Sequence, residues 1–127
     1  MSRRLRILMV EDDVDLRRMF RQVLALEGYD VLEAGNGLEA LHLLDAHIPD
    51  AVILDLGLPI ISGSVVREEI AAHAHTQQIP IIVVTGQPGN HEALDVACVL
   101  RKPVTPERLI HTVQSCIAAG GAALSSQ

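Results

Sequence analysis

Residues 51–59 read AVILDLGLP, and this stretch decides the fold. A short apolar run is followed by one acid, Asp55, and then by Gly57 and Pro59, which favour a loop. An apolar run of this length, closed by turn residues, is typical of a strand buried on both faces of a sheet. Asp55 would then lie at the carboxyl end of the strand, where open α/β sheets place their ligands.

The same pattern recurs outward in both directions along the chain. Apolar runs predict five strands, at residues 6–10, 29–34, 51–54, 80–84 and 98–100. Helical spacing or helix-start residues predict helices at about 14–26, 38–48, 65–74 and 105–118, and residues 91–96 allow only a short helix. Strands that alternate with helices predict an α/β class fold, a doubly wound five-stranded parallel sheet with a shortened fourth helix.

Length and composition predict one domain. The 127 residues suit one hydrophobic core, which we expect in residues 1–119, with 120–127 as a flexible C-terminal tail or linker stub. A net charge of -6 and 2% aromatic residues argue against direct nucleic-acid binding. No signal peptide or membrane-length apolar stretch is visible, and the two cysteines lack a metal or redox spacing. We therefore expect a cytoplasmic protein without membrane contact.

Reactive side chains close four of the five predicted strands. They are Glu11 and Asp12, Asp55, Thr85, and Lys102. Three carboxylates in one crevice repel each other unless one is protonated or a cation lies between them. An all-oxygen ligand set favours a hard cation such as Mg²⁺ (or Mn²⁺). This set suggests metal-assisted phosphoryl transfer with an aspartate nucleophile, and the lysine and threonine would be donors to the phosphoryl oxygens.

Other polar residues have simpler interpretations than a role in catalysis or metal binding. Asp13 is better placed to cap the following helix than to bind a metal. His73 and His75 are two apart, so on a helix they would point in different directions, and a zinc site is disfavoured. A basic face formed by Arg17, Arg18 and Arg21 is equally compatible with a solvated surface that balances acids and with a docking surface for a kinase.

Four segments together resemble the receiver (response regulator) domain family of bacterial two-component signalling systems. They are ILMVEDD at 7–13, ILDLGLP at 53–59 with Gly63, VTG at 84–86 and LRKP at 100–103. The resemblance covers Leu5 to about Ala118, nearly the whole chain. It implies a flavodoxin-like sheet of order 2-1-3-4-5, which is one of the common strand orders of doubly wound sheets.

The resemblance also implies roles for individual residues. Asp55 would be the phosphorylated nucleophile and also contact the metal, with Asp12 as a direct ligand and Glu11 holding metal-bound water. The backbone carbonyl of Gly57 would complete the protein ligands. Thr85 would be the switch hydroxyl, and Lys102 would pair with the phosphoryl oxygens, followed by a cis peptide bond to Pro103.

Two features depart from the family pattern. The segment between Thr85 and Lys102 is shorter than usual by more than one helical turn, which falls on the fourth helix. Val99 stands where the fifth strand usually carries an aromatic switch residue. Both departures lie on the usual dimer and output face. By the same resemblance, Gly57 and Gln87 would occupy the positions that influence hydrolysis.

The predicted function is a phosphoacceptor signalling module, not an enzyme acting on an outside metabolite. The donor would be a phosphohistidine of a histidine kinase or histidine phosphotransfer protein, and the downstream partner or attached output domain is unspecified. An alternative is a phosphorylation-independent pseudo-receiver that only binds a protein. A phosphatase is disfavoured because Gly57 stands where a second acid is usual, and a flavin or nucleotide binder because no glycine loop follows the first strand. The chain could be a stand-alone shuttle or part of a larger regulator.

Overall fold

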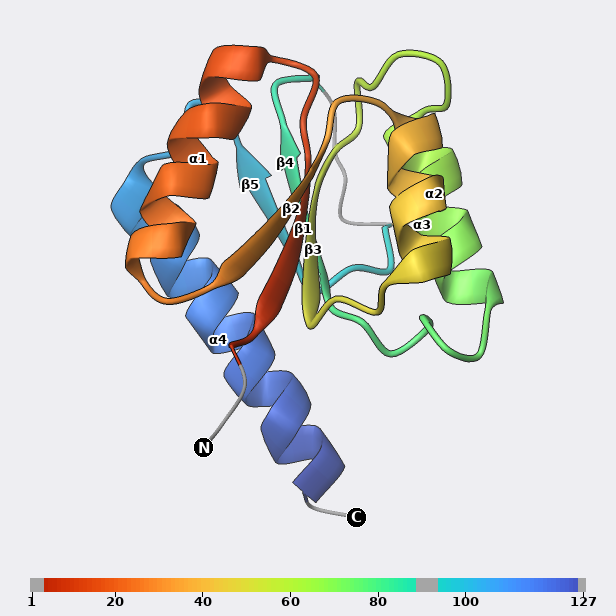
Figure 1. The fold of residues 1–127 in the computed structure, drawn as a ribbon, viewed down its shortest axis with the longest axis vertical. Helices are drawn as coiled ribbons and strands as arrows, with labels where there is room; N and C mark the ends of the chain where they lie inside the picture. Colours follow the sequence, from red (N-terminus) through yellow and green to blue (C-terminus); the bar gives the residue numbers. More distant parts are fainter. Residues whose placement is uncertain (1–3, 89–93, 126–127) are drawn as a thin grey trace.

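The computed structural model describes residues 4–88 and 94–125, and it shows a parallel sheet between two helical layers (Figure 1). The strand order is β2-β1-β3-β4-β5, as predicted. The strands are β1 (Arg6–Val10), β2 (Asp30–Ala34), β3 (Ala51–Asp55), β4 (Ile81–Thr85) and β5 (Cys98–Arg101). The helices are α1 (Val14–Leu26), α2 (Gly37–Ala46), α3 (Gly63–Ala72) and α4 (Pro106–Ser125).

Alternate residues of the central strands build two separate cores. Ile53 of β3 packs with Phe20 and Leu109 on the face covered by α1 and α4. Leu54 packs with Ile70 on the opposite face, which α2 and α3 cover (Figure 1). Every residue of β3 is buried, because helices cover both faces of a parallel sheet. The decisive stretch is therefore the centre of the molecule.

The carboxyl ends of the strands meet at one edge of the sheet. In the parallel register, Val10 lies beside both Ala34 and Leu54, and Asp55 lies beside Val84. This edge therefore carries the residues that directly follow β1 and the last residues of β3 and β4. This alignment brings together side chains that are far apart in the sequence.

Local signals place the start of α1 correctly. Asp13 caps the helix, as predicted, and its Oδ1 accepts a hydrogen bond from the Leu16 N–H at 3.0 Å. After the helix, Gly28 has the predicted positive φ, 93°, which glycine adopts without steric cost. The peptide bond between Lys102 and Pro103 is cis, as the resemblance implied.

Replacing Asp13 by Ala should lower the free energy of unfolding by about 1 kcal/mol, because the helix loses its capping acceptor. Asp13→Ser supplies another capping oxygen and should recover most of that loss. Urea denaturation of the three proteins measures both effects. Equal stability of the alanine variant and the wild type would show that the cap contributes nothing.

Several predicted helix boundaries differ from the structure, and the helices predicted at 38–48 and 65–74 end two residues early, at Ala46 and Ala72. The helix predicted at 65–74 begins at Gly63 instead, because the Ser62 hydroxyl accepts from the Val65 N–H and caps it earlier. The C-terminal helix continues to Ser125, beyond the predicted end near residue 118, although Gly120 and Gly121 in this segment are poor helix formers. The division into a domain and a tail from residue 120 stays a prediction.

The predicted short helix at 91–96 falls partly on residues 89–93, which lie outside the described residues. Residues 94–97 are not helical, so the described part of the chain contains no helix between β4 and β5. Among the same described residues, no helix has the length and apolarity that crossing a membrane requires.

Candidate functional site

Three carboxylates converge at the carboxyl edge of the sheet. Glu11, Asp12 and Asp55 each place one oxygen so that all three atoms lie within 4.8 Å of one another. Glu11 and Asp55 are buried, whereas Asp12 is exposed. Asp55 is in place because β3 ends there, and the other two follow β1 directly. The cluster that the strand ends predicted therefore exists in the folded chain.

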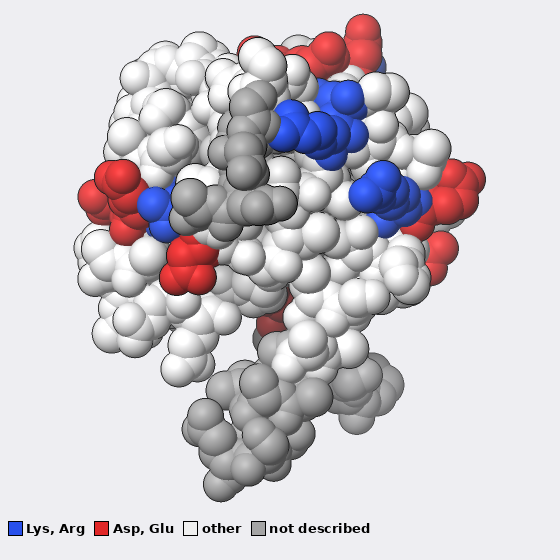
Figure 2. All heavy atoms as spheres, turned by 180° about the vertical axis from the view of Figure 1, so that it is seen from behind, with Lys and Arg blue, Asp and Glu red and all other residues white. Residues whose placement is uncertain are grey.

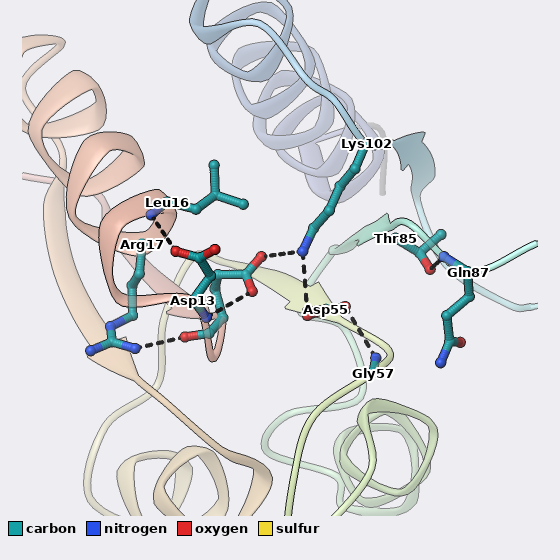
Figure 3. Close-up of polar contacts among 9 residues, drawn as sticks. Asp13, Leu16, Arg17, Asp55, Gly57, Thr85, Gln87 and Lys102 are labelled. Carbon is teal, nitrogen blue, oxygen red and sulfur yellow. Dashed lines mark hydrogen bonds and ion pairs between the residues drawn. The ribbon is translucent and has the colours of Figure 1, made fainter.

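The Lys102 ammonium lies against two of these carboxylates (Figure 3). Its Nζ is 2.7 Å from Glu11 Oε1 and 3.5 Å from Asp55 Oδ2. Burial by itself would lower the pKa of Lys102, but the hydrogen bonds and negative charges of Glu11 and Asp55 raise it overall. The lysine therefore remains charged and offsets part of the negative charge of the cluster.

One lysine does not neutralise three acids. Burial, and to a smaller extent the charge of Asp55, raise the pKa of Glu11 to about 7. Hydrogen bonds from Lys102 and from the Asp13 N–H, which lies 3.2 Å from Glu11 Oε2, act in the opposite direction. Because the ionised cluster is unfavourable without more positive charge, it suits an added cation.

The ligand chemistry fits the expected metal. All three side chains offer carboxylate oxygens, which Mg²⁺ and Mn²⁺ prefer, and the exposed Asp12 leaves room for water ligands. The backbone N–H of Gly57 donates to Asp55 Oδ1 at 3.1 Å, so the loop after β3 folds back toward the carboxylate. The role of the Gly57 carbonyl as a ligand stays a prediction.

Thr85 lies where predicted, at the end of β4, and is fully buried. Its Oγ1 accepts a hydrogen bond from the Gln87 N–H at 3.0 Å, and Figure 3 shows the pair beside the carboxylate cluster. The hydroxyl thus holds the first residues of the loop after β4. The expected movement of this hydroxyl toward a phosphoryl group would occur only in the phosphorylated protein, and it stays a prediction.

Arg17 is a residue near the site that the sequence analysis placed only in a basic face. Its Nη1 donates to the Glu11 carbonyl at 2.7 Å, and its Nε is 3.2 Å from Glu33 Oε1. Arg21 Nε lies 3.1 Å from the other oxygen of Glu33. These two arginines therefore balance an acid on β2, and Arg17 also holds the backbone that carries Glu11.

The prediction that His73 and His75 point in different directions on a helix is wrong. Because α3 ends at Ala72, both residues lie beyond the helix, and their rings form an edge-to-face pair with centroids 5.8 Å apart. Within the described residues, the acidic cluster around Asp55 is nevertheless the only group of three potential ligands close enough to share an ion.

Val99, at the usual aromatic position, is a half-buried aliphatic residue of β5. It lies beside Val83 of β4 and packs against the core on the α2 and α3 face. A small β-branched side chain has few rotamers, so it offers little of the in-or-out movement that a large ring can make. The departure from the aromatic-coupled switch stays a prediction.

Comparison with known proteins places this site in a family. The model of the response regulator receiver domain matches residues 7–114. The polar-differentiation response regulator DivK of Brucella anthropi is 32% identical over 114 residues, which cover 86% of this chain and 93% of DivK.

Solved structures agree with the sequence match. A CheY-like receiver domain from Methanospirillum hungatei superposes with a TM-score of 0.88 at 25% identity, covering 95% of this chain and 99% of that one. The receiver domain of the sensor histidine kinase PA1611 from Pseudomonas aeruginosa, whose active-site cleft coordinates a magnesium ion, gives 0.84 at 25% identity, covering 91% and 99%. With its sheet order, its acidic cluster and these matches, the chain belongs to the response regulator receiver domain family of two-component signalling.

Proposed function

We propose that Asp55 accepts a phosphoryl group from the phosphohistidine of a histidine kinase or a histidine phosphotransfer protein, and that Mg²⁺ (or Mn²⁺) bound beside it assists the transfer. The observation that carries this proposal is the position of Asp55 between two further carboxylates and the Lys102 ammonium at the end of β3. The magnesium ion in the cleft of the similar PA1611 domain supports the choice of metal.

Each residue of the site has a distinct part in the transfer. An oxygen of Asp55 attacks phosphorus while the bond between phosphorus and the donor imidazole nitrogen breaks, and the imidazole keeps that electron pair. Asp12 would be a direct ligand of the metal, Glu11 would hold metal-bound water, and the Gly57 carbonyl would be a further ligand. When bound, the cation neutralises charge on the phosphoryl oxygens and so lets two anions approach each other.

Lys102 is already placed to receive the product. An ammonium group has three N–H donors, so it can keep its 2.7 Å contact with Glu11 and donate to a phosphoryl oxygen on Asp55. Thr85 supplies a further donor if its hydroxyl turns from the loop after β4 toward the phosphoryl group. Such a turn would change the surface around Gln87, which is how the phosphorylated state would reach a partner.

The protein would promote only its own phosphorylation and dephosphorylation, so we do not propose an enzyme of metabolism. Its two cysteines are free thiols, which is consistent with work in the reducing cytoplasm. On the face drawn in Figure 2, basic side chains form small separate groups beside acids, which supports a protein partner over a nucleic acid. The kinase and the downstream partner are not specified.

Intact mass spectrometry after incubation with an acyl phosphate tests the proposal. We expect a gain of one phosphoryl group that requires Mg²⁺ or Mn²⁺. No gain with either metal would favour the pseudo-receiver that only binds a protein.

Replacing Asp12 by Ala should weaken Mg²⁺ binding by about tenfold or more, because a carboxylate ligand is lost. Isothermal titration calorimetry with MgCl₂ measures the affinity. Asp15→Ala is the matched control, because it removes another exposed acid, from the first turn of α1, and should leave the affinity unchanged. Unchanged binding by Asp12→Ala would remove this residue from the ligand set.

A further inference from the structure

A cavity of about 200 Å³ lies between α2 and α3. Both helices begin at the carboxyl edge of the sheet and run away from it. The residues that line the cavity come from the later turns of these helices and from the segment after α3 (Figure 1). Its apolar part is formed by Leu41, Leu44 and Ile70. This space, which we call the α2–α3 cavity, is therefore separate from the acidic cluster around Asp55.

Four side chains that can bind a metal line the α2–α3 cavity. They are Asp45 from α2, Glu69 from α3, and His73 and His75 from the segment that follows α3. Among the described residues that line the cavity, none is a lysine or an arginine. Asp45 makes no side-chain hydrogen bond or ion pair within the described part of the chain. Two imidazoles with two carboxylates are a ligand set typical of Zn²⁺, unlike the all-oxygen set of the acidic cluster.

The hydrogen bond of His73 leaves one of its ring nitrogens available to a metal. Its Nδ1 lies 2.8 Å from the Glu69 carbonyl oxygen. Because a carbonyl only accepts, Nδ1 carries a proton, and in the neutral ring Nε2 keeps its lone pair. Histidines that bind metals usually have this arrangement, in which the second ring nitrogen donates to a carbonyl or carboxylate and fixes the ring. The His73 ring is thus held in place with one nitrogen free to bind.

The turn after α3 places His75 beside His73, with the two ring centroids 5.8 Å apart. Two imidazoles that bind one Zn²⁺ in tetrahedral geometry, through nitrogen atoms at about 2.0 Å, have centroids roughly 5 Å apart. Buried Thr76 holds the turn, because its hydroxyl donates to the Ile70 carbonyl at 2.8 Å and its N–H donates to the His73 carbonyl at 3.1 Å. The turn therefore presents the two rings at nearly the separation that a shared ion requires.

We propose that the α2–α3 cavity is a second metal site, in which His73 and His75, together with Glu69 and Asp45, bind Zn²⁺ or another borderline divalent cation. Within the described residues, no three ligand atoms of this set lie within 4.8 Å of one another. All four side chains are exposed, so rotation about their side-chain bonds gathers them around an ion. The bound cation links α2 to the end of α3 and neutralises two acids. This proposal does not depend on the proposed phosphoryl transfer.

Calorimetric titration with ZnCl₂ in excess MgCl₂ tests the proposal, because the magnesium competes for the acidic cluster. We expect one bound zinc ion with a micromolar or lower Kd. His73→Gln and His75→Gln each remove an imidazole ligand and should weaken binding about tenfold or more. Asp45→Asn and Glu69→Gln test the carboxylate ligands and should also weaken binding. His42→Gln is the matched control, because His42 is exposed on α2 but does not line the cavity, and it should bind zinc like the wild type.

Two further measurements separate a metal site from a merely structural role of the histidines. In imidazole NMR spectra, zinc should shift the signals of His73 and His75 and leave those of His42 and His111 unchanged. At a free zinc concentration of roughly 100 times Kd, the melting temperature should rise by about 10 °C. His73→Gln should lose this rise but melt like the wild type without zinc, because the His73 side chain is 54% exposed. Phosphorylation of this variant by an acyl phosphate should be unchanged.

Four results would overturn the inference. Absence of zinc binding up to about 1 mM would show that the cavity is not a metal site. Wild-type affinity in both His73→Gln and His75→Gln would place the ion elsewhere. Loss of binding in Cys98→Ser, with none in His73→Gln, would assign the zinc to the free thiols of Cys98 and Cys116. Zinc that is bound without MgCl₂ but displaced by it would belong to the acidic cluster.

Discussion

Replacing Asp55 by Asn is expected to abolish phosphorylation by an acyl phosphate while the protein remains folded. The carboxamide has the same shape as the carboxylate but is not a nucleophile, so no phosphoryl bond forms. The loss of one negative charge also relieves repulsion with Glu11, whose pKa Asp55 raises. Stability should therefore stay equal to that of the wild type or increase.

Intact mass spectrometry and thermal denaturation measure the two effects together. The wild type should gain one phosphoryl group in the presence of Mg²⁺, and Asp55→Asn should gain none. Asp45→Asn makes the same chemical change at an exposed position of α2 and should be phosphorylated like the wild type. A phosphorylated Asp55→Asn protein would place the acceptor elsewhere.

Replacing Gly63 by Ala is expected to lower the free energy of unfolding by about 3 kcal/mol, as overpacking of a tight interior does. A Cβ at this position would collide with the Asp55 carbonyl oxygen and lie 2.7 Å from the Leu56 Cα. These are backbone atoms of β3 and its loop, so they cannot move aside as a flexible side chain can. Because Asp55 would shift with them, phosphorylation should also slow.

Urea denaturation measures this loss, and Gly86→Ala is its control. A Cβ at Gly86 would meet only the Lys102 side chain, at 3.7 Å or more, which is ordinary van der Waals contact. The Gly86 variant should therefore lie within about 0.5 kcal/mol of the wild type. Equal stability of both variants would mean that the close approach at Gly63 is relieved at little cost.

Local patterns in the sequence predicted the strands and the members of the carboxylate cluster, whereas the strand order came from the family resemblance. Apolar runs ending in polar residues gave the five strands, and the rule that parallel strands end at one edge gave the cluster of Glu11, Asp12 and Asp55. The cap at Asp13 and the turn at Gly28 were equally readable. The strands, the cap and the turn each depend on residues within a few positions of one another, whereas the cluster follows from the parallel arrangement of strands that are distant in the sequence.

Tertiary structure alone decided how the site residues pair. Lys102 and Asp55 are 47 residues apart, and only the packed sheet determines that the ammonium lies closer to Glu11 than to Asp55. Arg17 contacts the Glu11 carbonyl because α1 packs beside β2, and the pairing of His73 with His75 follows from an early helix end.

Ile60 shows the same division most clearly. As a residue type, isoleucine favours extended backbone, so nothing local in the sequence predicts a φ of 69°. The loop around Ile60 is instead held by tertiary packing, because Leu58 is buried, Ile61 packs against the core, and the first turns of α2 and α3 approach the loop backbone closely. Sequence by itself determined which residues reach the carboxyl edge. The packing of distant segments determined the conformations and partners of these residues, because two side chains contribute a contact free energy only after folding brings them together.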